Sequence, residues 1–345
     1  MDFIARPTRT SSKHTPDPIR FGNLSPAQPT VVYDTYWHLA VERQTIFFKR
    51  FRQEPAPWTD DPILRTHKFT NAYRASDRVS QYLIRNVIYE GEQNTNELLF
   101  RVLLFKFFNR IETWELLIRH LGEISYKNYN FQNYDAILTK AIESNQKIYS
   151  AAYIMPSGGA LCTDGRKHRM HLRLLDYMMK DGLPAQLERS RSLREAFEAL
   201  RSYPTLGDFL AYQYVIDLNY SPMMDFSENE FVMPGPGARD GISKCFSSLG
   251  GLTETQIIHV VAERQQAEFE RLGLNFYPLW GRDLHLIDCQ NLFCEVDKYA
   301  RVRHPEFCGL TGRTRIKQTF NPTSAPIHPW YPPKWGINDA IDLRK

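Results

Sequence analysis

The sequence has no apolar run of about 18 residues or more, so it holds no candidate transmembrane helix. Residues 1–20 also lack the apolar middle region of a secretory signal. We therefore expect an intracellular protein with no membrane partner, nuclear in a eukaryotic host and cytoplasmic in a bacterial or phage setting.

Cysteine is sparse and irregularly spaced. The five cysteines form no CxxC pair and no Cys/His cluster, which argues against a disulfide framework and against a structural zinc site. We expect neither zinc nor haem. The phosphate-binding motif G-x-x-x-x-G-K-[ST] is also absent.

Convincing alternating strand patterns are scarce, whereas helical periodicity recurs along most of the chain. One apolar face begins after Thr30 and stops at the prolines of "EPAPW". The very apolar segment 94–122 is expected to form two core helices that break near Asn109 to Thr113. The sequence predicts an all-α protein, a compact multi-helix domain of about ten helices.

The two ends differ from this helical body. Residues 1–29 have little apolar periodicity and are expected to form a flexible arm, ahead of a helical domain over residues 30–303. Residues 304–345 are basic and rich in proline and aromatics, so we expect them to be extended and draped over the helices, where they could also face nucleic acid.

Charge and aromatic content permit a nucleic-acid partner without requiring one. The formal net charge is +4 and aromatics make up 13% of the residues. A mild positive charge suits phosphate backbones, and a surplus of rings suits stacking on bases.

The first polar cluster accompanies a helix start in "FTNAYRASDRVSQYLI". Arg74, Arg78 and Arg85 would share a broad helix face if the helix begins early enough, and with Asn71 they could clamp phosphate. The alternative is a surface Arg–Asp network with a capping role.

A second cluster lies inside the apolar segment "FKFFNRIETWE". Lys106, Asn109, Arg110 and Glu112 must find partners there or line a cavity. Internal hydrogen bonding is the alternative to a functional role.

The third cluster begins at a short turn with Leu206 and Gly207 in front of "DFLAYQYVIDLNYS", the form of a helix-hairpin-helix. It continues through the acidic residues Asp225, Glu228 and Glu230 to the glycine-rich turn "MPGPGARDGISK". Backbone N–H groups at such a helix start favour an anion, and Arg239 and Lys244 add positive charge. A plain connection between two helices explains the glycines equally well.

A fourth cluster follows one face of a predicted helix. Asp288, Asn291 and Glu295 are spaced so that they lie close together on that face. They could bind Mg²⁺ through oxygen ligands or form a buried polar zipper to another helix.

Six blocks in chain order together resemble one family: "FTNAYRASDRVSQYLI", "FKFFNRIETWE", "AYIMPSGG", "FLAYQYVIDLNYS", "EFVMPGPGARDGISKCF" and "DCQNLFCEVDKY". The sequence is similar to the helical domain of 5-hydroxymethyluracil DNA kinases, a family also described as α-glutamyl/putrescinyl thymine pyrophosphorylases. The resemblance spans about residues 30–303.

The resemblance implies a helix-hairpin-helix DNA glycosylase-like architecture and an enzyme that flips a 5-hydroxymethylpyrimidine out of DNA. Phosphate or pyrophosphate is then transferred to the hydroxymethyl oxygen. The implied donor is ATP or another nucleoside triphosphate, and the implied metal cofactor is Mg²⁺. The catalytic aspartate of the glycosylases would fall near Glu228 or Glu230, where this sequence has no clean equivalent. That departure counts against base excision.

On this basis the candidate catalytic carboxylates are Asp217, Glu230 and Asp240. The residues expected to bind phosphate or DNA are Asn71, Arg74, Arg78, Gly207, Gly235, Gly237, Arg239 and Lys244. The expected partners are DNA with a modified thymine and a separate P-loop kinase or other base-modification enzymes. The missing P-loop leaves open whether this chain binds the nucleotide itself or relies on such a kinase partner. Two alternative functions are a glycosylase for a modified pyrimidine and a non-catalytic reader of modified DNA.

Overall fold

A computed structural model describes residues 15–20, 22, 24–156, 165–323 and 325–342. The N-terminal half contains α1 (Val31–Phe51), α2 (Pro62–Thr66), η1 (Arg74–Ser76), α3 (Arg78–Leu83), η2 (Ile84–Ile88), α4 (Thr95–Phe108), α5 (Ile111–Leu121), α6 (Phe131–Glu143) and α7 (Lys167–Lys180). The remainder contains α8 (Leu183–Arg189), α9 (Leu193–Arg201), α10 (Asp208–Asn219), α11 (Pro236–Cys245), α12 (Glu254–Arg271), α13 (Leu286–Arg303), η4 (Pro333–Trp335) and α14 (Asn338–Asp342). The prediction of a mostly helical domain is confirmed, and 14 α-helices fall within the described ranges. None of these helices is long and apolar enough to cross a membrane.

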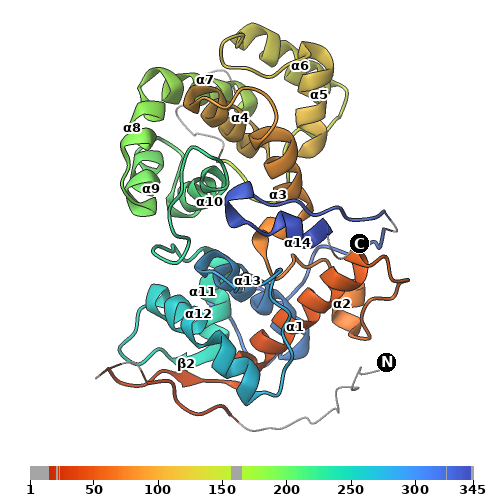
Figure 1. The fold of residues 1–345 in the computed structure, drawn as a ribbon, viewed down its shortest axis with the longest axis vertical. Coiled ribbons are helices and arrows are strands. Elements are labelled where there is room, and N and C mark those ends of the chain that lie inside the picture. Colours follow the sequence, from red (N-terminus) through yellow and green to blue (C-terminus); the bar gives the residue numbers. More distant parts are fainter. Residues whose placement is uncertain (1–14, 21, 23, 157–164, 324, 343–345) are drawn as a thin grey trace.

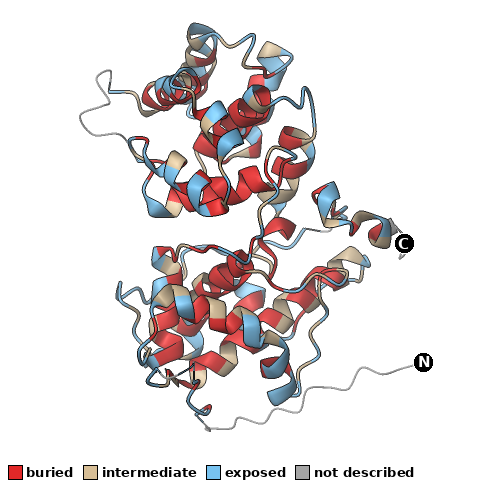
Figure 2. Ribbon diagram, turned by 60° about the vertical axis from the view of Figure 1, so that its left-hand side comes forward, coloured by how far each residue is buried: buried red, intermediate tan, exposed pale blue. Residues whose placement is uncertain are grey.

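The helices form two lobes (Figure 1). Helices α4 to α10 lie in one lobe, whereas α1, α2 and α11 to α13 lie in the other with the short strands β1 (Gln28–Pro29) and β2 (Phe246–Ser248). The first lobe is thus one continuous stretch of the chain, whereas the second joins segments that precede and follow it in the sequence. Figure 2 shows buried residues on the inward faces of the helices in both lobes, and these residues form a single connected core.

The break in the apolar segment lies where the sequence predicted it. Helix α4 begins after Asn94, whose side chain accepts a hydrogen bond from the Glu97 N–H at 3.0 Å. The helix ends at Asn109, which adopts a left-handed conformation with φ of 48°. Asparagine tolerates this conformation better than most residues, so the chain can turn there and start α5.

The glycine-rich turn places α11 against α13 at very short range. A Cβ atom added to Gly241 would lie 1.9 Å from the carbonyl oxygen of Phe293, a backbone atom that cannot move aside. At Gly235 such an atom would lie 2.6 Å from the Phe209 ring, and at Gly237 it would lie 3.1 Å from the Cys294 sulfur. Close helix packing therefore accounts for these three glycines.

Both ends of the chain contact the helical body where they are described. Residues 1–14 of the expected N-terminal arm lie outside the described residues, but further along β1 pairs with β2, and Ile19 and Ala27 are buried. After α13 the chain runs beside segment 66–68, where the Phe320 N–H donates to the Thr66 carbonyl at 2.9 Å. The C-terminal residues then lie between the lobes, where Tyr331 is buried.

The contact between α11 and α13 gives a test of the packing. We expect Gly241→Ala to lower the free energy of unfolding by about 3 kcal/mol or more, because the new methyl group must displace backbone. Gly207→Ala is the matched control, since a Cβ there meets nothing within 4 Å and φ is −75°. Its cost as a helix cap is limited to about 1 kcal/mol. Equal losses in chemical denaturation would contradict this view of the glycine-rich turn.

Candidate active site

Three segments meet at one buried carboxylate. Asp217 of α10 accepts hydrogen bonds from both terminal nitrogens of Arg74, at 2.7 and 3.0 Å, in a bidentate pair. The ammonium group of Lys106, on α4, lies 3.0 Å from the second oxygen of Asp217. All three residues are almost fully enclosed, with exposed fractions of 1% for Arg74, 2% for Lys106 and 0% for Asp217. We call these three residues the charged centre.

Polar and aromatic groups surround the two cations. The Nε atom of Arg74 donates to the Gln213 side chain at 2.9 Å, and a terminal nitrogen donates to the Tyr220 hydroxyl at 3.3 Å. Lys106 donates to the Asn109 side chain at 2.8 Å. The Tyr153 ring covers both cations, 4.6 Å from the Lys106 ammonium and 5.7 Å from the Arg74 guanidinium.

The charges of the centre do not balance, because two cations share one carboxylate. Burial raises the pKa of Asp217, but Arg74 and Lys106 more than offset this, so its pKa lies below the usual range. Burial lowers the pKa of Lys106 to about 8, against the opposing attraction of Asp217. A buried surplus of positive charge is costly unless an anion compensates it.

Two residues at the centre have unusual backbone conformations. Asn109 and Tyr153 both have positive φ, at 48° and 53°, and both side chains contact Lys106. Non-glycine residues in this region cost about 1–3 kcal/mol each and cluster at functional sites. Asn109 tolerates this region and ends α4 there, so the positive φ of Tyr153 is the one that supports a functional role for the centre.

The polar face of α13 holds the segment that carries Arg74. Asp288 accepts the Arg74 backbone N–H at 2.8 Å, and Glu295 accepts the Thr70 N–H at 2.9 Å. Asn291 donates to the Thr70 hydroxyl at 3.0 Å. The stripe therefore forms a polar zipper, but its partner is the turn segment 70–74 and not another α-helix as predicted. Across the described ranges, no group of three or more His, Cys, Asp or Glu side chains is arranged to hold a metal ion.

The charged residues of the glycine-rich turn do not join the centre. Lys244 is buried and pairs with Asp297 at 2.9 Å, while Arg239 is exposed and pairs with Glu254 at 3.0 Å. Asp240 is buried and accepts hydrogen bonds from the N–H and the hydroxyl of Thr311. Lys244 and Asp240 thus serve helix packing and attachment of the C-terminal segment in this structure.

The other predicted residues lie around the centre's edges or away from it. Asn71 stabilises the turn before η1 by donating to the Ser76 carbonyl at 2.8 Å. Arg78 is exposed, because the α-helix begins only at that residue and Arg74 precedes it in a 3₁₀ turn. The prediction that Arg74 and Arg78 share one helix face is therefore wrong. Gly207 begins α10, and Glu230 is exposed in the loop before α11.

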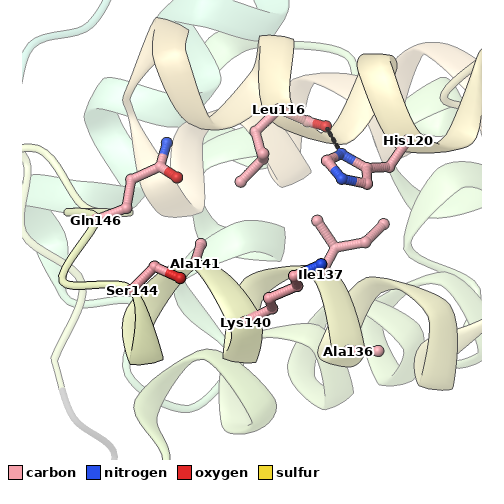
Figure 3. Close-up of a pocket in the computed structure, with 8 residues that line it drawn as sticks. All are labelled: Leu116, His120, Ala136, Ile137, Lys140, Ala141, Ser144 and Gln146. Atoms are coloured by element: carbon pink, nitrogen blue, oxygen red, sulfur yellow. Dashed lines mark hydrogen bonds between the residues drawn. The ribbon is translucent and has the colours of Figure 1, made fainter.

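Two surface hollows are separate from the charged centre. One, of about 280 Å³, lies between α5 and α6 and is lined mainly by apolar side chains and by polar groups such as His120 and Lys140 (Figure 3). Another, of about 470 Å³, lies between the 53–58 loop and the chain around Pro322. Neither hollow contains a residue of the centre, so size alone does not identify the site.

Sequence reasoning selected Arg74 and Asp217 but left Lys106, Gln213 and Tyr153 out of the candidate site. A signal for Lys106 existed, because a lysine inside a strongly apolar segment needs a buried partner. Gln213 and Tyr153 carry no such signal. Their roles depend on how α10 and the loop before α7 approach Arg74.

Comparison with known proteins identifies the family of this chain. Residues 30–309 match the family model described as "5-hmdU DNA kinase, helical domain". The chain belongs to this family. A curated relative, the "5-hmdU DNA kinase" of Bacillus phage SP10, is 27% identical over 307 residues, which cover 83% of this chain.

The match covers less than half of the relative's own length. The chain spans 47% of the length of the phage protein, and no solved structure matches the chain significantly. The family match includes every residue of the charged centre and stops before the basic part of the C-terminal segment. The family is one of 5-hmdU DNA kinases, which are phosphotransferases.

Lys106 gives a pH-dependent test of the centre. The pKa of Lys106 is about 8 in the folded protein, whereas in the unfolded chain it has its ordinary value of about 10.5. Between these values the unfolded chain binds more protons, so the wild-type free energy of unfolding gains up to about 1.4 kcal/mol per pH unit from this group. We expect Lys106→Met to lose this gain in denaturation curves between pH 7.5 and 9.5. Parallel curves for the two proteins would contradict the lowered pKa of the buried Lys106.

Proposed function

We propose that this chain binds DNA containing 5-hydroxymethyluracil and supports transfer of phosphate from a nucleoside triphosphate to the hydroxymethyl oxygen. Membership of a 5-hmdU DNA kinase family supports this reaction class. Because the chain spans only about half of the phage relative, the activity of that whole protein is part of the proposal.

The observation that carries the proposal is the surplus positive charge at the centre. Arg74 and Lys106 share one carboxylate, and Tyr153 covers both cations. A phosphoryl group in transfer carries negative charge on its equatorial oxygens, and fixed cations in a site without water stabilise it strongly. Asp217 would then fix the positions of the two cations.

The acceptor must leave the DNA stack to reach such a buried centre. Unstacking costs a few kcal/mol, which stacking on aromatic rings can offset. Tyr153 and Phe209 stack at 5.8 Å beside the centre, and both are half-buried. We assign these rings to the flipped base, and we retain the α9–α10 pair as the proposed DNA-contacting helical hairpin.

In the proposed reaction, the hydroxymethyl oxygen attacks the terminal phosphorus of the nucleotide. The P–O bond to the nucleoside diphosphate breaks, the hydroxyl loses its proton, and the new phosphoester forms on the base. Arg74 and Lys106 hold the transferred group during this exchange. We reassign the phosphate role from Arg239 and Lys244 to Arg74 and Lys106. No side chain is assigned as the general base that accepts the hydroxyl proton.

The nucleotide and its magnesium fit the described residues poorly. No carboxylate cluster suited to a metal is present among them, and the sequence has no Walker A loop. We therefore assign none of the described residues to hold magnesium in the proposed reaction. A separate P-loop kinase remains a proposed partner that would supply the donor.

Incubation with a hydroxymethyluracil duplex, nucleoside triphosphate and Mg²⁺, followed by mass analysis of the nucleosides, tests the function. We expect a phosphorylated hydroxymethyl nucleoside from the wild-type protein. Lys106→Met should reduce transfer about 100-fold or more, because one stabilising group is lost. Arg239→Gln, which alters an exposed arginine of the glycine-rich turn, is the control and should retain transfer.

Each other product contradicts a different part of the proposal. Loss of transfer in Arg239→Gln alone would return the phosphate site to the glycine-rich turn. Release of free base would identify a glycosylase, and tight binding with no product would identify a reader of modified DNA. A repeat with the P-loop kinase partner added separates a reader from a protein that lacks only its donor.

A further inference from the structure

The C-terminal segment carries a concentration of basic residues outside the charged centre. Residues 301–320 contain five basic residues and one carboxylate: Arg301, Arg303, Arg313, Arg315 and Lys317 against Glu306. Their net charge of 5 − 1 = +4, with His304 neutral, equals the formal net charge of the whole chain. The rest of the protein is therefore close to neutral, and the positive charge is concentrated in this segment.

Three of these cations occupy every second position of a stretch without helix or turn. The chain runs without a helix or turn from Gly312 to Gln318, and alternate residues of an extended chain share a face. Arg313, Arg315 and Lys317 are exposed, whereas Ile316 between them packs against the core. Among the described residues, no carboxylate pairs with any of these three side chains.

The segment is attached to the part of the chain that leads to the charged centre. The Lys68 N–H donates to the Gln318 carbonyl at 3.0 Å, and His67 forms an antiparallel bridge with Thr319. Lys68 itself is exposed. Two residues further on, Thr70 begins the segment that α13 holds in place and that ends at Arg74. We call Lys68, Arg313, Arg315 and Lys317 the basic strip.

We infer that the basic strip binds the phosphate backbone of duplex DNA and aligns it with the segment that carries Arg74. This inference rests on the proposed function for the choice of DNA as the partner. Alternate residues of an extended chain are spaced by about 6.6 Å. The axial rise of two nucleotides in one DNA strand is about 6.8 Å, so successive cations of the strip can follow one strand. Such contacts add affinity that is independent of base sequence.

Salt dependence of binding tests the strip directly. Fluorescence anisotropy would give the dissociation constant for an unmodified duplex between 50 and 200 mM salt. Each lost phosphate contact should make the slope of log K against log salt shallower by about 0.9. We therefore expect the triple variant Arg313→Gln, Arg315→Gln, Lys317→Gln to reduce the slope by about 2 to 3, and Lys68→Gln to reduce it by about 1.

A matched triple variant on the other lobe controls for net charge. Arg119, Lys140 and Lys147 are exposed on α5, on α6 and just after α6, so Arg119→Gln, Lys140→Gln, Lys147→Gln removes the same charge elsewhere. It should leave the slope unchanged. An unchanged slope in the strip variant, or an equal loss in the control, would overturn the inference. Tighter binding of a single strand with the same loss of slope would overturn the assignment to duplex.

The same proteins separate this inference from the proposed function. The strip variant should need a higher DNA concentration to reach half-maximal transfer to hydroxymethyluracil DNA, because the strip supplies affinity for the duplex. Failure of transfer in every protein, with the slope still reduced in the strip variant, would contradict the phosphotransfer proposal and leave the strip intact. Thermal unfolding of each variant should match wild type, since the substituted side chains are exposed.

Discussion

The rest of the site depends on one interaction, the burial of the Asp217 carboxylate between Arg74 and Lys106. These three groups come from α10, from the turn before α3 and from α4, so the centre connects segments that are far apart in the sequence. Enclosing ions in a protein interior costs several kcal/mol per ion unless their attraction and their hydrogen bonds compensate it. Here the second cation exceeds what the carboxylate can neutralise, which is difficult to explain by stability alone.

Polar contacts connect the centre, which lies in the lobe of α4 and α10, to the lobe that contains α13. Asp288 and Glu295 on α13 accept backbone N–H groups of Arg74 and Thr70, so one lobe fixes the segment whose side chain enters the other. The C-terminal residues reinforce this connection. Trp335 packs edge-on against Tyr220, which also contacts Arg74, and the guanidinium of Arg282 stacks 3.7 Å from the Trp335 ring.

Sequence patterns predicted the parts of this structure that depend on neighbours along the chain. The periodicity after Thr30 predicted α1, and the polar break at Asn109 predicted the boundary between α4 and α5, because both features are local. The pattern could not show which polar residues meet in space. Lys244 and Lys106 are both lysines in apolar segments, yet one pairs with Asp297 in helix packing and the other forms part of the charged centre.

The glycine-rich turn also shows that the sequence does not specify which segments meet in space. Its glycines fit an anion site and a close helix contact equally well when only the sequence is known. The short approach of Gly241 to the Phe293 carbonyl, which lies more than fifty residues away in the sequence, favours the helix contact. The basic C-terminal segment was predicted to be extended, but its attachment beside Lys68 depends on backbone pairing that no local pattern specifies.

The pKa of Lys106 is the most direct measure of whether the centre receives an anion. It can be followed by NMR titration of the ¹³Cε-labelled lysine side chains, assigned with Lys106→Met, in the free protein and in complexes with duplex DNA. A value near 8 is expected in the free protein. A duplex carrying the phosphorylated hydroxymethyl base should raise it, because an adjacent negative charge favours the charged lysine, whereas an unmodified duplex should raise it less. A Lys106 pKa that is the same in both complexes and in the free protein would contradict a phosphate-binding role for the charged centre.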